Sequence, residues 1–352
     1  MKYRYLGNSG LKVSEMTLGT MTVGGEERFS MVGNLGVKET SEIIHMCIDH
    51  GINLIDTANI YSFGRSEEIV GEVLSGKRPG DVLISTKARM PQGEGPNDAG
   101  ISSYHLVREC ERSLKRLRTD VIDLYYLHEW DGTTPLEEAL EALSRLIQQG
   151  KIRYIGCSNF SGWHIMKALG ISKEQNLPRF VAQQIHYTLE AREAEYELLP
   201  IARDQGVGVH VWSPIAGGLL SGKYTRDKKP GGVTRMSEGW TEPPVRDEER
   251  LWNIVDTLIE IAGDRKASPA QVALSWLLTR PGVASLVIGG RTIDHIRENL
   301  EAVHLMLSEE EITRLNWVSE PPLLYPYWHQ LKFARDTFSP GDWALFQGRS
   351  EL

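Results

Sequence analysis

The sequence predicts an α/β protein in which eight parallel strands close into a barrel surrounded by helices. Short runs rich in Ile, Val and Leu alternate with longer amphipathic segments along most of the 352 residues, and this alternation is typical of parallel strands joined by helices. No Gly-x-Gly-x-x-Gly motif follows an early strand, which disfavours an open, doubly wound sheet.

Each predicted strand is short and is bounded by polar or glycine residues. The strand-like runs cover residues 16–18, 53–56, 82–86, 122–127, 154–157, 181–185, 207–212 and 286–288. Helical periodicity is clearest at residues 39–50, 67–74, 106–117, 136–149 and 268–279. The last of these has Pro269 at its start, where proline is favourable. We also expect an N-terminal β-hairpin before the first barrel strand.

Two segments fall outside this alternation. Residues 213–245 are rich in glycine, proline and lysine, and a loop of that length within a compact domain is usually functional or mobile. Residues 319–352 are irregular but rich in aromatic side chains, whereas a disordered tail would be poor in them. We therefore predict a single barrel domain over residues 1–318 and a tail, 319–352, that packs on the barrel at its mouth or at an oligomer contact.

The composition is that of a globular enzyme, with 41% hydrophobic and 24% charged residues and a net charge of −8. No apolar run approaches the roughly 20 residues that span a bilayer, and the N-terminus has no apolar signal segment. We therefore expect no membrane association. Three widely spaced cysteines, Cys47, Cys110 and Cys157, argue against a disulfide framework and favour a cytoplasmic location.

One basic cluster stands out, formed by Arg112, Lys115, Arg116 and Arg118. These residues follow an apolar-periodic segment, so we interpret them as the solvated face of a helix near its C-terminus, where cations are favoured. No longer basic block indicates nucleic-acid binding, and no metal-ligand motif is present in the sequence.

Four chemically active side chains fall near the ends of three predicted strands. Asp56 closes the run at 53–56, Tyr61 lies in the following loop, Lys87 follows the run at 82–86 and His128 follows the run at 122–127. The carboxyl ends of barrel strands meet at one face. A buried ammonium beside a phenol would lower the pKa of the phenol. We therefore predict that Tyr61 exchanges a proton with a carbonyl or carbinol oxygen, that Asp56 holds Lys87, and that His128 orients the substrate.

The chain resembles the aldo-keto reductase superfamily over roughly residues 1 to 318. The matching stretches are residues 6–14, 18–20, 56–68, 86–87, 127–128, 155–160, 184–187, 212–215, 218–223 and 289–291, followed by Asn299. This resemblance implies a (β/α)8 TIM barrel that binds NADP(H) without a Rossmann domain. It also implies an oxidoreductase that interconverts an aldehyde or ketone and the corresponding alcohol, with Tyr61 as general acid in reduction and base in oxidation.

The resemblance also assigns residues to the cofactor. Ser158, Asn159 and Gln184 match the residues that bind the nicotinamide carboxamide, and Trp212 takes the position that stacks on the ring. Segment 213–223 matches the loop that wraps the pyrophosphate. The implied cofactor contacts are Thr20, Met21, Asp56, Ser158, Asn159, Gln184, Trp212, Ser213, Pro214, Leu219, Ser221, Lys223, Gly289, Arg291, His295 and Asn299.

The choice between the two nicotinamide cofactors depends on Arg291, which matches the adenosine 2′-phosphate site. An arginine fork suits a phosphate better than a ribose hydroxyl, so NADP(H) is favoured. His295 stands where many relatives have Gln, and this departure leaves NAD(H) as an alternative.

The substrate is expected to be a small carbonyl or alcohol compound. Trp130, Phe160 and Tyr187 lie just beyond strand ends, so we expect them to line its pocket. Two other functions stay open: an alcohol or sugar dehydrogenase that works mainly in the oxidative direction, and a cofactor-binding regulatory subunit of a membrane channel. The identity of the substrate and the oligomeric state, including a homo-oligomer, are left undecided by the sequence.

Overall fold

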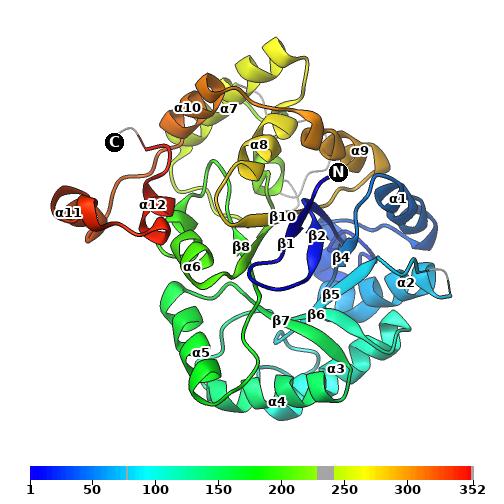
Figure 1. Ribbon diagram of the computed structural model, residues 1–352. Helices are drawn as coiled ribbons and strands as arrows, with labels where there is room; N and C mark the ends of the chain where they lie inside the picture. Colours follow the sequence, from blue (N-terminus) through cyan, green and yellow to red (C-terminus); the bar gives the residue numbers. More distant parts are fainter. Residues whose placement is uncertain (77, 228–241, 350–352) are drawn as a thin grey trace.

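The barrel predicted from the sequence is present. The computed structural model describes residues 1–76, 78–227 and 242–349, so part of the long loop predicted at 213–245 lies outside the described residues. Within them, parallel strands close a barrel in the order β10-β3-β4-β5-β6-β7-β8-β9 (Figure 1). The barrel strands are β3 (Met16–Gly19), β4 (Leu54–Asp56), β5 (Leu83–Ala88), β6 (Ile122–Leu127), β7 (Ile152–Ser158), β8 (Ala182–His186), β9 (Gly208–Trp212) and β10 (Val283–Ile288).

Helices surround the barrel (Figure 1). The α-helices that precede the tail are α1 (Val37–Asp49), α2 (Arg65–Leu74), α3 (Ser103–Leu117), α4 (Leu136–Gln148), α5 (Gly162–Glu174), α6 (Leu198–Gln205), α7 (Glu248–Arg265), α8 (Pro269–Leu278), α9 (Ile293–Leu300) and α10 (Glu309–Val318). Short 3-10 helices are η1 (Glu27–Met31), η2 (Tyr61–Gly64), η3 (Glu193–Glu195), η4 (Ala216–Ser221), η5 (Glu301–His304) and η6 (Arg335–Thr337). The five segments with the clearest periodicity are confirmed as α1 to α4 and α8.

Strand residues alternate between the barrel interior and the layer of helices, because successive side chains of a strand point to opposite faces. Ile55 and Ile84 belong to the core between strands and helices. Their neighbours Leu54 and Leu83 instead pack at the start of the barrel together with Leu6. Burial on both faces explains why these strands read as nearly continuous apolar runs.

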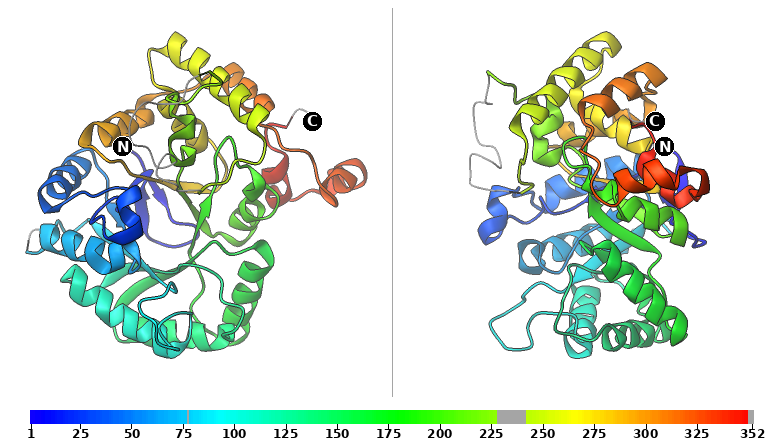
Figure 2. Two further views of the ribbon diagram at one scale, coloured as in Figure 1. Left: turned by 180° about the vertical axis from the view of Figure 1, so that it is seen from behind. Right: turned by 90° about the vertical axis from the view of Figure 1, so that its left-hand side faces the viewer.

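The predicted N-terminal hairpin closes one end of the barrel. Strands β1 (Tyr3–Tyr5) and β2 (Lys12–Ser14) pair antiparallel, and Leu6 and Val13 pack against residues at the amino ends of the barrel strands. Figure 2 shows the hairpin at one end and the loops over residues 20–36 and 89–102 projecting at the other. The interior is therefore accessible from the carboxyl end of the strands.

The tail is more regular than its sequence indicates. It contains two short helices, α11 (Tyr327–Phe333) and α12 (Pro340–Phe346). Helix α12 packs against α6, whereas α11 has no buried residue and protrudes from the body (Figure 1). The expected irregular structure is thus corrected at these helices: a capping box at Ser339 and a proline in the first turn of α12 favour a helix there.

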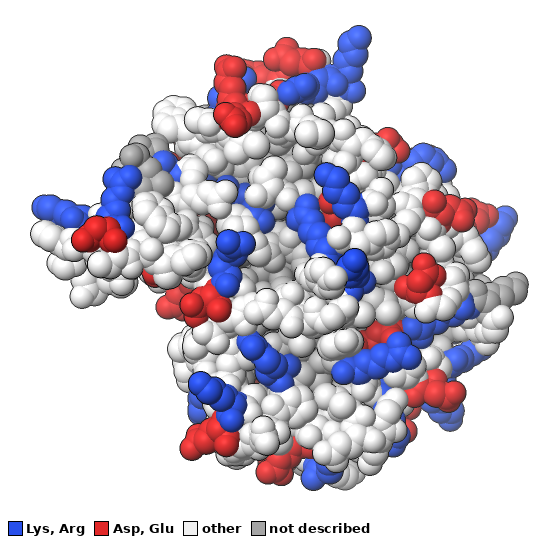
Figure 3. All heavy atoms as spheres, in the orientation of Figure 1, with Lys and Arg blue, Asp and Glu red and all other residues white. Residues whose placement is uncertain are grey.

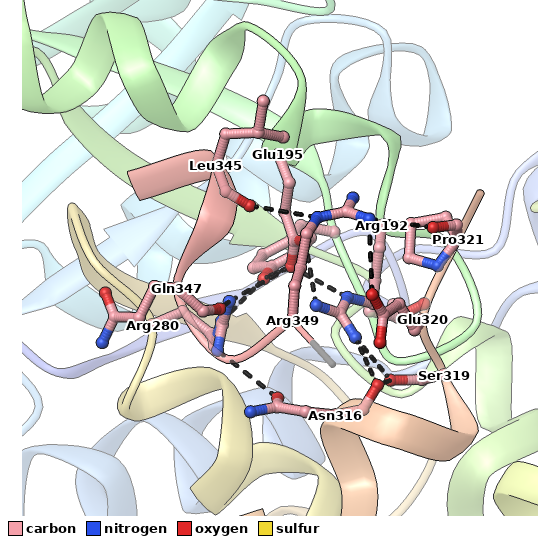
Figure 4. A network of polar contacts seen from close by, with 12 residues as sticks. Arg192, Glu195, Arg280, Asn316, Ser319, Glu320, Pro321, Leu345, Gln347 and Arg349 are labelled. Carbon is pink, nitrogen blue, oxygen red and sulfur yellow. Dashed lines mark hydrogen bonds and ion pairs between the residues drawn. The ribbon is translucent and has the colours of Figure 1, made fainter. Parts of the chain in front are cut away.

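Buried charges connect the tail to the barrel (Figure 4). Glu195 accepts hydrogen bonds from Arg192 through both oxygens, at 2.9 and 3.0 Å, and from Arg280 at 3.3 Å. Arg280 also donates to the carbonyl of Gln347 in the tail at 3.1 Å. Arg192, Glu195 and Arg280 are each at most 4% exposed, so one carboxylate compensates two buried guanidinium groups.

This arrangement makes Glu195 important for stability. We predict that Glu195→Gln lowers the free energy of unfolding by about 3 kcal/mol, because it leaves two buried cations without their carboxylate. Glu193→Gln, an exposed position of the same turn, is the control and should change it by less than about 0.5 kcal/mol. Urea unfolding followed by circular dichroism measures both, and equal effects of the two substitutions would contradict the prediction.

Candidate active site

A cavity of about 910 Å³ lies at the carboxyl end of the barrel strands. Asp56, Tyr61 and His128 line it, and Lys87 lies behind them, fully buried. The structure therefore brings the four residues predicted from the strand ends together. Lys87 lies within β5 rather than after it, and its side chain points inward like that of Ser85, two residues earlier on the same face.

The Lys87–Asp56 ion pair lies at the bottom of the site. The Nζ atom of Lys87 donates to Asp56 Oδ2 at 2.5 Å and to the carbonyl of Thr57 at 2.8 Å. The other carboxylate oxygen, Oδ1, accepts from Ser85 Oγ at 2.6 Å and from Gln184 Nε2 at 3.2 Å. Burial would lower the pKa of Lys87, but the Asp56 carboxylate and Tyr61 raise it, and the net direction is upward. Lys87 is therefore a cation in the folded protein.

Tyr61 lies directly above this pair. The Nζ atom of Lys87 is 5.1 Å from the centre of the Tyr61 ring. The next residue, Ser62, has a φ of 49°, a left-handed conformation that is rare outside glycine. Hydrogen bonds hold this turn in place: Ser62 Oγ donates to the carbonyl of Val23 and accepts from the amide of Gly25, both at 2.9 Å.

The pKa of Tyr61 differs from the sequence-based expectation. Lys87 lowers this pKa, as the sequence predicts, but it does not decide the net direction. Burial raises the pKa and outweighs the lowering by Lys87, so the net direction is upward. Tyr61 is thus protonated at neutral pH, as a proton donor must be.

His128 follows β6 directly, and its ring meets the Tyr61 ring edge-on at 5.8 Å between centroids. Burial lowers the pKa of His128, and repulsion from Lys87 and Arg89 lowers it further, so that it lies well below its ordinary range. The imidazole is therefore neutral. A neutral imidazole can still donate one hydrogen bond to a substrate oxygen.

Residues expected at the nicotinamide line the same cavity near Tyr61. They are Ser158, Asn159, Gln184 and Trp212, and the implied cofactor contacts Thr20 and Met21 line the cavity as well. The indole of Trp212 donates to Asn159 Oδ1 at 3.0 Å, and Asn159 Nδ2 donates to the carbonyl of His128 at 3.3 Å. Trp212 is thereby linked to the loop that carries His128.

Residues expected at the phosphates and adenosine line this cavity too. They are Ser213, Pro214, Ser221, Lys223, Gly289, Arg291, His295 and Asn299. The Nζ atom of Lys223 lies 3.2 Å from His295 Nε2, and Arg291 donates to the carbonyls of Met31 and Val32. Leu219 is different: it belongs to the hydrophobic core and is not among the lining residues.

The structure does not bring the three expected substrate-pocket aromatics to the cavity lining. Tyr187 is fully buried, and its hydroxyl donates to Glu195 at 2.6 Å. Trp130 stacks on His164 at 3.7 Å and meets Phe160 edge-on. Tyr187 differs from the prediction because it directly follows His186, which lines the cavity. Consecutive residues of an extended chain point to opposite sides, so the Tyr187 side chain faces away from the cavity.

Other cavity residues had not been identified from the sequence. They include Arg28, Phe29, Ile60, Glu129 and His186. Alternation along β8 could have identified His186, because it lies two residues after Gln184 on the same face. No local pattern marks Phe29, whose ring lies 6.2 Å from that of Tyr61, because it comes from η1 in a loop.

The described residues lack a metal-binding cluster and a membrane-spanning helix. No cluster of three or more His, Cys, Asp or Glu side chains suits a metal ion among them. Likewise, in the described part of the chain no helix has the length and apolar character needed to cross a membrane.

Comparison with known proteins places the chain in a family. The model of the Aldo/keto reductase family matches residues 15–320, and the chain belongs to this family. It is 36% identical over 332 residues to the uncharacterized oxidoreductase YrpG of Bacillus subtilis, covering 92% of this chain and 97% of that protein. It is 33% identical over 350 residues to the versiconal hemiacetal acetate reductase of Aspergillus parasiticus, covering 93% and 99%.

Another relative carries a different name. A probable voltage-gated potassium channel subunit beta of Arabidopsis thaliana is 36% identical over 310 residues, covering 87% of this chain and 92% of that protein. The family and the relatives named as oxidoreductases support a carbonyl/alcohol oxidoreductase.

The depressed pKa of His128 has a consequence for stability. The ordinary pKa of a histidine is 6.5. When the pH is below this value, His128 binds a proton in the unfolded chain but not in the folded protein, so the free energy of unfolding falls as the pH decreases. We predict that between about pH 7 and about pH 5 the free energy of unfolding falls less steeply for His128→Asn than for the wild type. The two slopes should differ by up to about 1.4 kcal/mol per pH unit. Urea unfolding at several pH values measures both slopes, and parallel curves would disprove the assignment.

Proposed function

We propose that this protein is an NADP(H)-dependent oxidoreductase that interconverts an aldehyde or ketone and the corresponding alcohol. The observation that carries the proposal is the position of Tyr61, above the buried Lys87–Asp56 ion pair and in one cavity with Asn159 and Gln184. The family and the relatives named as oxidoreductase and reductase support it. The cofactor, when bound, supplies or accepts the hydride.

The proton is handled by Tyr61. In reduction the neutral phenol gives its proton to the carbonyl oxygen, and the cation of Lys87 stabilises the phenolate that remains. Asp56 holds Lys87 in place through the 2.5 Å contact. His128, neutral because of its depressed pKa, donates a hydrogen bond to the same substrate oxygen. In oxidation the phenolate removes the proton from the alcohol.

The cavity suits a nicotinamide dinucleotide in its chemistry. Amide and hydroxyl groups of Ser158, Asn159 and Gln184 suit a carboxamide, and Lys223 and Arg291 suit phosphates. In the η4 segment, Gly218 has a φ of 102° and open space where a side chain would begin. The backbone can therefore approach a pyrophosphate closely.

Removal of the Tyr61 hydroxyl tests the proton transfer. We predict that Tyr61→Phe lowers kcat for carbonyl reduction by about 100-fold or more, because general acid catalysis contributes about that much. NADPH binding, measured by fluorescence titration, should stay unchanged. Tyr104→Phe, at an exposed tyrosine of α3, is the control and should retain full activity. Undiminished turnover in Tyr61→Phe would refute the role of this residue.

Selectivity between the cofactors tests Arg291. We predict that Arg291→Leu weakens NADP+ binding about tenfold more than NAD+ binding, because one charge-assisted contact to the extra phosphate is lost. The ratio of the two dissociation constants is the measurement. It cancels any general disturbance from the loss of the contacts between Arg291 and the carbonyls of Met31 and Val32. An unchanged ratio would exclude Arg291 as the 2′-phosphate ligand.

The direction of the reaction in the cell is a separate question, because the four residues serve reduction and oxidation alike. An alcohol or sugar dehydrogenase working mainly in the oxidative direction uses the same groups. Assays of aldehydes and ketones with NADPH, and of alcohols with NADP+, distinguish the two by their values of kcat/KM.

The second candidate function is that of a cofactor-binding regulatory subunit of a membrane channel, which the name of the Arabidopsis relative favours. An intact proton-transfer site does not separate this function from the first. Co-purification with a membrane protein together with negligible turnover of every carbonyl tested would favour it, whereas ready turnover without such a partner favours the enzyme.

A further inference from the structure

A second cavity, of about 530 Å³, lies on the outside of the barrel between α2 and α3 and shares no lining residue with the first. Its lining includes five cations and two carboxylates on a chain of net charge −8, and two buried carboxylates behind the lining form ion pairs with two of these cations. The cations are Arg65, Arg112, Lys115, Arg116 and Arg118. Figure 3 shows Lys and Arg side chains along the lower right flank, over α2 and α3, with acidic side chains among them.

Two of these cations are held from beneath by fully buried carboxylates. Arg116 Nε donates to Glu67 Oε2 at 2.6 Å, and Arg112 Nη1 donates to Glu109 Oε1 at 2.9 Å. Glu67 and Glu109 are both 0% exposed. The carboxylates therefore fix each guanidinium group on its inner side, while both arginine side chains remain part of the groove wall.

The buried carboxylates are themselves anchored in the barrel layer. The other oxygen of Glu67 accepts from Thr86 Oγ1 at 2.6 Å, and the other oxygen of Glu109 accepts from Asn59 Nδ2 at 3.1 Å. Donor groups that are already oriented lose less conformational freedom on binding a ligand. Arg112 and Arg116 thus differ from surface arginines that move freely in water.

The other cations are less strongly neutralised. Lys115 is exposed and has no ion-pair partner among the described residues, and Arg118 reaches Glu72 at only 3.9 Å. The pair between Arg65 and Glu68 is exposed on both sides, and such pairs contribute little. The basic cluster of the sequence, interpreted there as a solvated helix face, is therefore part of a concave surface between two helices.

We propose that this groove binds a small compound that carries two or three phosphate groups. Arginine forks match phosphate oxygens in geometry and charge. The α3 wall from Arg112 to Arg118 spans about 9 Å at a rise of about 1.5 Å per residue, which is long enough for several linked phosphates. Glu68 and Glu72 follow Arg65 on the α2 wall, opposite the cations of α3, so a long polyanion such as nucleic acid is disfavoured. The proposal does not depend on the proposed reaction.

Tripolyphosphate is the probe for the test. Isothermal titration at constant ionic strength compares the wild type with Lys115→Gln/Arg118→Gln, which removes two exposed groove cations. Lys173→Gln/Arg203→Gln removes two exposed cations from α5 and α6 and is the matched control. Lys223→Gln reports on phosphate binding in the active-site cavity. Circular dichroism and urea unfolding verify that each variant is folded.

We expect saturable binding to the wild type that is at least about tenfold weaker in the groove variant, because two charge-assisted contacts are lost. The matched control should retain the wild-type affinity, and Lys223→Gln should leave unchanged the binding step that the groove variant weakens. Absence of saturable binding would overturn the proposal. Equal weakening in the groove variant and the matched control, or weakening confined to Lys223→Gln, would also overturn it, because binding would then be non-specific or would belong to the active-site cavity.

Discussion

The buried ion pair between Lys87 and Asp56 is the interaction on which the candidate active site depends. Both side chains are at most 2% exposed, and their charged atoms lie 2.5 Å apart. Burial of two charges costs free energy unless further hydrogen bonds satisfy them. Here Ser85 and Gln184 donate hydrogen bonds to the Asp56 carboxylate, and the carbonyl of Thr57 accepts one from the Lys87 ammonium. The register in which Asp56 lies opposite Ser85 on the neighbouring strand makes these contacts available.

The ion pair also acts on the pKa values of the groups around it, although burial is the larger effect for each of them. Lys87 opposes the effect of burial on the pKa of Tyr61 and adds to the effect of burial on the pKa of His128. Deeper in the barrel, burial lowers the pKa of His210 to about 4, although Asp56 acts in the opposite direction. His210 shares a hydrogen bond of 2.8 Å with Tyr126. The pair is thus surrounded by neutral polar groups, and a phenol and a neutral imidazole line the cavity in front of the buried ammonium.

The remaining structure keeps this site at one end of the barrel. The hairpin closes the opposite end, and the tail packs outside the barrel against α6 rather than on the cavity, where none of its described residues is found. The Arg192–Glu195–Arg280 network joins the tail to the segment after β8. The groove between α2 and α3 is likewise built on buried carboxylates, Glu67 and Glu109, which contact Thr86 and Asn59 near the site.

The sequence by itself determined the barrel and its strands, and it identified four polar residues near the strand ends that the structure brings together. Strands buried on both faces must be apolar, and polar residues at their carboxyl ends stand out against that background. Tertiary structure decided what depends on groups distant in sequence. Burial set the net direction of the Tyr61 pKa, and Tyr187 turned away from the cavity to meet Glu195 and Arg280. A loop brought Phe29 to Tyr61, and two adjacent helices turned a basic cluster into the wall of a groove. Such contacts leave no local periodicity, because they arise only when separate elements pack together.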